Sequence, residues 1–181
     1  MKQALIIIDV QNDYFEGGKM PLHNPLKALE NIEYVLTKFR EKGLPVIHIQ
    51  HICEPDDDFF QPNTNGAEIH SRLTPLCNEY HFIKHMPSSF LGTGLEKLLK
   101  EEKISDVVVC GMMSHMCVDT TVRACQDFGL NVILLDDACA TMDLDYNGEV
   151  ISAETVHKTY MASLDGVFAK IIKTDELVLV N

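Results

Sequence analysis

Apolar and polar positions follow two different rhythms along the chain. Short runs of apolar, mostly β-branched residues are typical of buried strands, and they fall at residues 4–8, 45–49, 81–83, 106–110, 131–135 and 168–172. Stretches with apolar residues at helical spacing lie between them, at residues 25–42, 93–102, 114–128 and 152–164. Gly43 and Gly129 follow two of these stretches, where a left-handed residue commonly ends a helix.

This alternation predicts an α/β fold in which helices cover both faces of a parallel sheet. Strands that are apolar throughout are buried on both sides, which is typical of parallel sheets. The crossover connections are expected to be right-handed. The chain has 181 residues and shows no repeat or linker, so we expect a single domain over residues 1–181.

Residues 52–80 do not fit the alternation. They contain three prolines, an Asn-Gly pair and an acidic run at 56–58. A long irregular connection inside a compact domain is commonly a functional loop, and this one follows the carboxyl end of a strand, where α/β sheets bind ligands. The alternative is a solvated excursion on the surface, and the sequence leaves both interpretations open.

Composition and charge exclude several classes of protein. The chain is 46% hydrophobic and 23% charged, as expected for a folded globular protein. Fifteen basic and 27 acidic residues give a net charge of −12, which argues against nucleic acid or an anionic membrane as partner. The apolar run at 4–8 is too short to span a bilayer and does not resemble a secretory signal. Six cysteines without a Cys-x-x-Cys pair predict reduced thiols in a cytoplasmic protein.

Three polar residues stand where chemistry is expected, at or just beyond the ends of predicted strands. Asp9 follows the first strand, and a partly buried carboxylate there suits proton transfer. Lys84 follows the third strand, and its ammonium can stabilise a thiolate. Cys117 lies in the expected first turn of a helix, whose free N–H groups should lower the thiol pKa below about 8.5 and can hold an oxyanion.

Each of these residues also has a purely structural interpretation. Asp9 could cap the following turn, Lys84 could be a solvated surface charge, and Cys117 could be a small buried hydrophobe. In a doubly wound sheet, however, the first, third and fourth strands direct their carboxyl ends to one crevice. The three side chains can therefore meet there as a base, a cation and a nucleophile.

Three segments in this order resemble the isochorismatase-like cysteine hydrolase superfamily, and the resemblance covers nearly the whole chain. They are Ile-Ile-Asp-Val-Gln-Asn-Asp at 7–13, Lys84 followed by Ser-Phe-Leu-Gly-Thr-Gly-Leu at 89–95, and Gly-Met-Met-Ser-His-Met-Cys-Val-Asp-Thr-Thr-Val-Arg-Ala at 111–124, which runs into residues 129–141. The resemblance implies a three-layer α/β/α Rossmann-like fold with a mostly parallel six-stranded sheet in the order 3-2-1-4-5-6. It also implies a catalytic Asp-Lys-Cys triad, here Asp9, Lys84 and Cys117.

The resemblance carries further implications. The family tends to have a cis peptide after the fourth strand, which by position would be Met112–Met113. The N–H groups of Met113 and Cys117 would then form the oxyanion hole. Members commonly form dimers or tetramers, so a homo-oligomer is expected.

A metal is not expected. The nicotinamidase branch of the superfamily binds zinc or iron through an Asp-x-His motif at the end of the second strand, where this chain has Gln50-His51-Ile52. His48, His51, Cys53 and His70 remain conceivable ligands, but alternation along a strand separates His48 from His51. We therefore expect an enzyme without metal or cofactor, and the departure disfavours nicotinamide as substrate.

The substrate contacts are the least determined part of the site. Phe59, Phe60 and Phe90 could form an apolar wall for a small-molecule substrate, or they could pin the 52–80 segment to the body. His115 could contact substrate or support the helix start.

Three functions remain open. The leading one is hydrolysis of an amide, ureido or carbamoyl C–N bond through a thioester on Cys117. The second is vinyl ether hydrolysis of the isochorismatase type, which needs acid rather than a thiol and, for a dicarboxylate, arginines from among Arg40, Arg72 and Arg123. The third is a redox-active or oligomeric module without hydrolytic activity.

Overall fold

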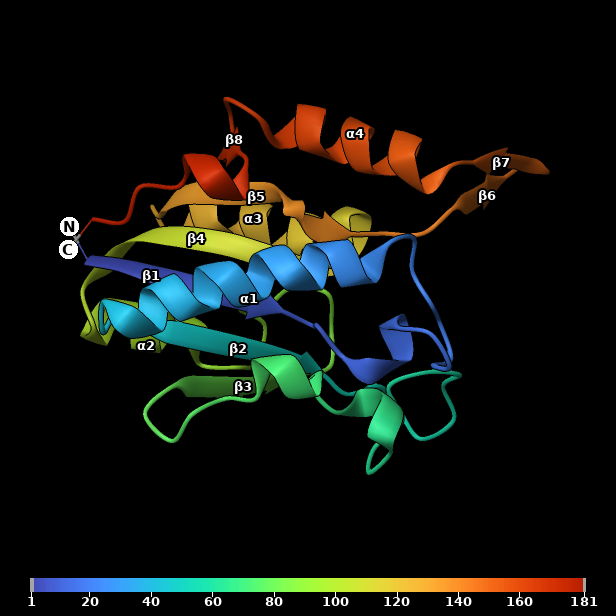
Figure 1. The fold of residues 1–181 in the computed structure, drawn as a ribbon, viewed down its shortest axis with the longest axis horizontal. Helices are drawn as coiled ribbons and strands as arrows, with labels where there is room; N and C mark the ends of the chain where they lie inside the picture. Colours follow the sequence, from blue (N-terminus) through green and yellow to red (C-terminus); the bar gives the residue numbers. More distant parts are fainter. Residues whose placement is uncertain (1, 181) are drawn as a thin grey trace.

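A six-stranded parallel sheet forms the centre of the structure, a computed structural model that describes residues 2–180 (Figure 1). Its strands are β1 (Lys2–Ile8), β2 (Val46–His51), β3 (Tyr80–Lys84), β4 (Ile104–Met112), β5 (Asn131–Ala140) and β8 (Lys170–Ile172). They lie in the order β3-β2-β1-β4-β5-β8, and each neighbouring pair is parallel. The predicted α/β fold and the order 3-2-1-4-5-6 are confirmed, with β8 as the sixth strand.

Helices cover both faces of this sheet and complete three layers. They are α1 (Pro25–Glu41), α2 (Leu95–Glu101), α3 (Asp119–Asp127) and α4 (Ala153–Leu164). Side chains alternate along β1, so Leu5 and Ile7 join the core under α1, while Ile6 and Ile8 join a second core under the other three helices. Each face of the sheet is therefore buried by its own apolar layer.

The ends of two predicted helices lie where the glycines indicated. Gly43 and Gly129 have φ angles of 63° and 69°, in the left-handed region that residues with a Cβ rarely adopt. The start of α4 is fixed by a different device, because the Ser152 side chain accepts a hydrogen bond from the Thr155 N–H.

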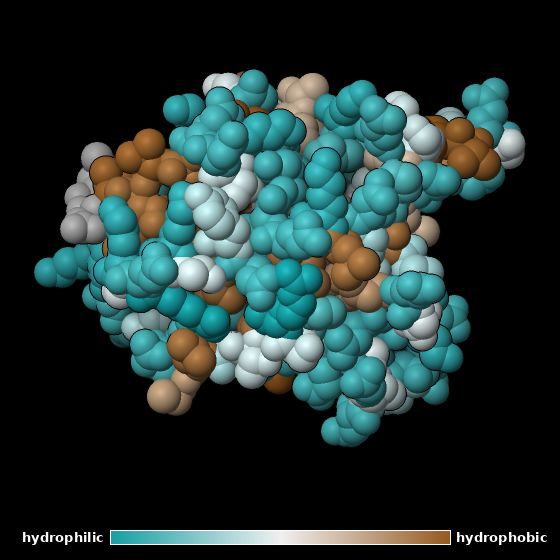
Figure 2. All heavy atoms as spheres, viewed as in Figure 1, coloured by the Kyte–Doolittle hydropathy of each residue, from teal (hydrophilic) through white to brown (hydrophobic). Residues whose placement is uncertain are grey.

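The pattern of apolar residues missed a two-stranded hairpin, β6 (Leu144–Tyr146) and β7 (Glu149–Ile151). Asn147 and Gly148 form its turn with positive φ angles of 54° and 81°, which suits a two-residue hairpin turn. Strands of three residues are too short to show a clear alternation. The hairpin projects beyond the body, and apolar atoms are visible near its end (Figures 1 and 2), where Tyr146 is 69% and Val150 71% exposed.

Among the described residues, none of the helices combines the length and the apolar character that crossing a bilayer requires.

The 52–80 segment is more ordered than its sequence predicts. It contains two short 3-10 helices, Asn65–Ala67 and Ser71–Leu73. Phe60 and Leu73 are fully buried, and the Phe60 N–H donates to Asp13 Oδ2 over 2.7 Å. The segment is therefore packed against the body rather than a freely solvated excursion.

Candidate active site

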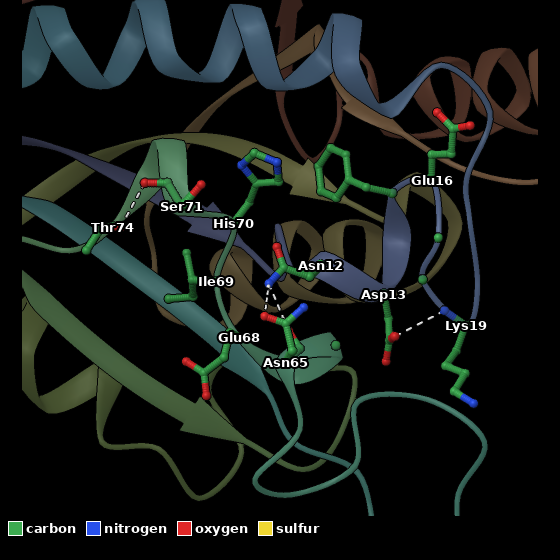
Figure 3. Close-up of a pocket in the computed structure, with 14 residues that line it drawn as sticks. Asn12, Asp13, Glu16, Lys19, Asn65, Glu68, Ile69, His70, Ser71 and Thr74 are labelled. Atoms are coloured by element: carbon green, nitrogen blue, oxygen red, sulfur yellow. Dashed lines mark hydrogen bonds between the residues drawn. The ribbon is translucent and has the colours of Figure 1, made fainter.

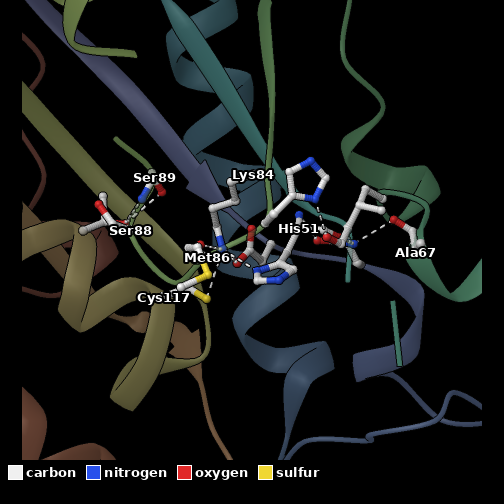
Figure 4. A network of polar contacts seen from close by, with 12 residues as sticks. His51, Ala67, Lys84, Met86, Ser88, Ser89 and Cys117 are labelled. Atoms are coloured by element: carbon white, nitrogen blue, oxygen red, sulfur yellow. Dashed lines mark hydrogen bonds and ion pairs between the residues drawn. The ribbon is translucent and has the colours of Figure 1, made fainter. Parts of the chain in front are cut away.

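The carboxyl edge of the sheet brings together the three residues that the sequence singled out. Lys84 Nζ lies 2.7 Å from Asp9 Oδ2 and 3.1 Å from Cys117 Sγ (Figure 4). Asp9 and Lys84 are at most 1% exposed, and Cys117 is 6% exposed. Because β2 lies between β1 and β3, the long lysine side chain is what carries the charge across to the other two groups.

The backbone conformation at the ends of β1 and β4 brings Asp9 and the turn that carries Cys117 close together. Asp9 has a φ of 51°, which turns the chain sharply out of β1, while its N–H still donates to Ile49 O. Gly111 has a φ of 132°, and a Cβ there would lie 2.1 Å from the Ile8 carbonyl oxygen. Only glycine lets β4 approach β1 this closely, so Gly111 places the cysteine turn beside Asp9.

Cys117 lies in a π-helical turn, Ser114–Val118, that precedes α3. The predicted continuous helix over 114–128 therefore consists of this turn followed by α3. The peptide bond Met112–Met113 is cis, as the resemblance implied, and the Met113 carbonyl accepts from the N–H groups of Met116 and Val118. The backbone of Met113 and the turn that carries Cys117 thus lie next to each other.

Two side chains of the turn anchor it to neighbouring elements. Ser114 Oγ lies 2.8 Å from His157 Nδ1 of α4 and donates to the Ala140 carbonyl of β5. His115 Nδ1 lies 2.5 Å from Thr141 Oγ1, and its ring meets Tyr160 edge to face. His115, which the sequence offered as a substrate contact, is thus placed as a support of the turn.

His51 is a fourth member of the cluster that the sequence did not identify as such. Its Nδ1 lies 2.7 Å from Lys84 Nζ, and the Met86 carbonyl accepts from the same ammonium over 3.1 Å. Gln50, which the sequence placed at the motif position, points away and binds Ala67 O. The feature that could have identified His51 is the parallel register, which pairs His51 of β2 with Lys84 of β3 at one edge of the sheet.

Burial dominates the electrostatics of the cluster. It raises the pKa of the Asp9 carboxyl above its ordinary value, and Lys84 opposes this shift. Burial also raises the pKa of the Cys117 thiol, and the neighbouring Asp9 charge adds to this, against the pull of Lys84. The predicted lowering of the thiol pKa is therefore wrong, because the turn buries the sulfur next to a carboxylate. Both effects favour the protonated form of the resting thiol.

The surroundings of Asp9 fit it to receive that proton. Its Oδ1 is buried and accepts no hydrogen bond from the described residues. A carboxylate oxygen of Asp9, a ring nitrogen of His51 and Cys117 Sγ all lie within 4.8 Å of one another. A proton that leaves the sulfur therefore has a nearby acceptor with an unoccupied lone pair.

A carboxylate, an imidazole and a thiol at this spacing would suit a divalent metal. Here, however, Lys84 Nζ lies between 2.7 and 3.1 Å from an atom of each, so the ammonium already occupies the position of a cation. His48 pairs with Glu79, and His70 packs on the Phe15 ring. The cluster does not fit a metal while Lys84 keeps this position.

The aromatic residues do not form one wall. Phe60 packs on Tyr14 and approaches the His51 ring, with centroids 6.2 Å apart, and the Phe59 ring lies tilted against the Phe60 ring. Phe90 packs instead on Phe128, in the core on the opposite face of the sheet. Phe59 and Phe90 therefore pack against different apolar layers, and their contact with a substrate stays a prediction.

A polar groove of about 760 Å³ lies beside the cluster's supporting loops rather than on the cluster itself (Figure 3). Residues 12–19 form one side, and residues 65–74 form the other. None of its lining residues belongs to the group of Asp9, His51, Lys84 and Cys117.

Comparisons with known proteins agree with this architecture. The family model described as "Isochorismatase domain" matches residues 3–176. The chain is 49% identical over 180 residues to the uncharacterized isochorismatase family protein YddQ of Bacillus subtilis, covering 99% of each chain. The crystal structure of an isochorismatase from Pseudomonas putida superposes with a TM-score of 0.93 at 36% identity, covering 97% of this chain and 90% of the other. N-carbamoylsarcosine amidase from Thermoplasma acidophilum superposes with a TM-score of 0.82 at 26% identity, covering 98% and 99%.

Proposed function

Because this chain belongs to the isochorismatase family of hydrolases, we propose that it cleaves a C–N bond in a small amide, ureido or carbamoyl compound through a thioester on Cys117. The observation that carries the proposal is the position of Lys84 Nζ, 2.7 Å from Asp9 Oδ2 and 3.1 Å from Cys117 Sγ. A base, a cation and a thiol in one buried cluster are the parts that nucleophilic acyl chemistry requires.

The first step is attack by sulfur. Asp9 Oδ1, which accepts no hydrogen bond from residues 2–180, takes the thiol proton as the sulfur lone pair bonds to the carbonyl carbon. The negative charge moves from Asp9 to the sulfur and onward to the carbonyl oxygen, within reach of the Lys84 ammonium. The N–H groups of Met113 and Cys117 are the proposed donors to that oxyanion.

The second half reverses the proton transfer. Protonated Asp9 gives its proton to the leaving nitrogen as the C–N bond breaks, which leaves a thioester on Cys117. Asp9, again a carboxylate, then takes a proton from water, whose oxygen attacks the thioester carbon. Release of the acid returns the proton to sulfur, so Asp9 serves as base and acid in turn.

The ion pairs of the arginines favour an amide substrate over the vinyl ether of an anionic dicarboxylate, which would need free arginines to bind it. Arg40 pairs with Glu79, Arg72 with Glu33, and Arg123 with Asp119. These are the three arginines of the chain, and each is held by a carboxylate that is not part of the cluster. The amidase with the same fold is a further argument for C–N chemistry.

The remaining expectations stay part of this proposal. The substrate is a small molecule, and neither nucleic acid nor a membrane is the partner of so acidic a chain. All six cysteines are free, which agrees with a cytoplasmic location. A homo-oligomer, dimer or tetramer, is expected, and light scattering after size exclusion tests it.

A panel of small amides, ureas and carbamates tests the central claim. Wild type should release amine or ammonia from at least one compound, and Cys117→Ala should release none. Quenched reactions of the wild type should show the acyl adduct on Cys117 by intact mass. Full activity of Cys117→Ala would overturn the proposal, and a sulfenate or mixed disulfide without turnover would favour the redox alternative.

A further inference from the structure

We infer that His51 is a positioning residue, which fixes the Lys84 ammonium between Asp9 and Cys117 by accepting one of its hydrogen bonds at Nδ1. The inference deepens the proposed function and rests on it. The contact is 2.7 Å long, as short as the one between Lys84 and Asp9.

The fold holds the imidazole firmly in this place. His51 ends β2 and pairs in register with Lys84 of β3. The Gln11 side chain binds both backbone groups of His51: its Oε1 accepts from the N–H, and its Nε2 donates to the carbonyl, each over 2.8 Å. The Phe60 ring packs nearby, 6.2 Å from the imidazole between centroids.

The Lys84 ammonium has fewer hydrogens than polar neighbours, so a fixed acceptor decides how its hydrogens are shared. An ammonium has three N–H groups, and four polar atoms lie within 3.1 Å of Lys84 Nζ: the ion-paired Asp9 Oδ2, His51 Nδ1, the Met86 carbonyl and Cys117 Sγ. While the thiol is protonated, the first three can take the three hydrogens. When the proton passes to Asp9, the hydrogen directed at Asp9 can turn to the new thiolate, while His51 and Met86 keep theirs. Lys84 can then follow the charge without leaving its place.

This role requires an unprotonated Nδ1, which only a neutral imidazole with its hydrogen on Nε2 provides. Burial and the Lys84 charge lower the pKa of His51 to about 4, His85 acts in the same direction, and Asp57 opposes them. Asp9 and Cys117 are further titratable groups that lie close to the ring. His51 is therefore neutral at the pH where a hydrolase of this kind is assayed.

Two substitutions separate the acceptor from the bulk of the ring. In His51→Asn the side-chain oxygen stands near the position of Nδ1 and can accept from Lys84. In His51→Leu there is no acceptor, and the buried ammonium loses one of its partners. His81→Leu is a matched control, because His81 lies on the neighbouring strand and binds Gln50 instead of Lys84.

The readout is the pH dependence of Cys117 alkylation by iodoacetamide, which needs no substrate. We expect His51→Leu to alkylate about tenfold more slowly than wild type near pH 8, which corresponds to a rise of about one unit in the thiol pKa. His51→Asn should stay within about threefold of wild type, and His81→Leu should match wild type. With an identified substrate, His51→Leu should lower kcat and leave KM within about twofold.

The outcomes distinguish this inference from the proposed function. An alkylation profile of His51→Leu equal to wild type, in a protein with unchanged melting temperature, would overturn the inference even if Cys117 proves essential for turnover. Equal losses in the Asn and Leu variants would also overturn it, because the ring rather than its acceptor would then matter. Absence of turnover on every compound would count against the proposed function and leave the alkylation test in force.

Discussion

Replacement of Lys84 by methionine removes the charge of the cluster and keeps most of the volume of the side chain. Asp9 is fully buried, and Lys84 is its ion-pair partner. Removing one partner of a buried pair costs about 3–5 kcal/mol, because the other charge stays in the interior without compensation. We therefore expect Lys84→Met to lower the free energy of unfolding at pH 8, measured by urea titration, by an amount of this size.

The loss should depend on pH in a defined direction. The folded-state pKa of Asp9 is already raised, and without the opposing Lys84 charge it rises further. A carboxyl whose pKa is higher in the folded than in the unfolded state favours folding when protonated, and this contribution is lost as pH rises through the folded pKa. The destabilisation of Lys84→Met relative to wild type should thus be smaller at pH 5.5 than at pH 8.

A double-mutant cycle checks the cause. Asp9→Asn in the Lys84→Met background removes the stranded charge, so the double variant should recover most of the lost stability at pH 8. Urea unfolding followed by circular dichroism at both pH values measures all four proteins. Equal losses at pH 5.5 and pH 8, or a double variant no more stable than Lys84→Met, would refute the argument that an uncompensated Asp9 charge is responsible.

Three further results are expected. Asp9→Asn should lower turnover at least about 100-fold, since the base is lost. Cys117 of this variant should nevertheless alkylate faster than in wild type near pH 8, because the Asp9 charge raises the thiol pKa. Slower alkylation would contradict this account. Gly111→Ala should lower the free energy of unfolding by about 2 kcal/mol or more, because its Cβ would lie 2.1 Å from Ile8 O at a φ of 132°. A urea unfolding curve equal to that of wild type would show that β1 and β4 need no such approach. Activity should survive dialysis against EDTA, since the ammonium occupies the cation position; loss in EDTA with recovery on zinc would contradict this.

The sequence predicted the fold of the protein better than the contacts within its candidate active site. Continuous apolar runs identified the strands, and strand ends located Asp9, Lys84 and Cys117, because both signals are local. His51 was missed as a partner of Lys84, since the contact depends on the register between two strands. The direction of the thiol pKa was wrong for a related reason, because the burial of Cys117 and its distance from Asp9 exist only in three dimensions.

The aromatic residues illustrate the same limit. Phe59 and Phe90 are apolar residues in irregular segments, and nothing local shows on which face of the sheet each will pack. The hairpin of β6 and β7 escaped prediction because each strand is only three residues long.

The 52–80 segment is attached to the body through its main chain as well as through buried side chains such as Phe60 and Leu73. Phe60 and His70 contribute their N–H groups to Asp13 Oδ2 and Val10 O, and Glu68 contributes its carbonyl to Asn12 N–H. The main-chain hydrogen bonds do not themselves depend on which side chains the segment carries, apart from Gly66, whose Cβ would strike the Asp13 carboxylate. Mutations at the exposed positions of this segment can therefore accumulate during evolution without loosening the cluster beneath it, which gives lineages with this scaffold a route to new specificities.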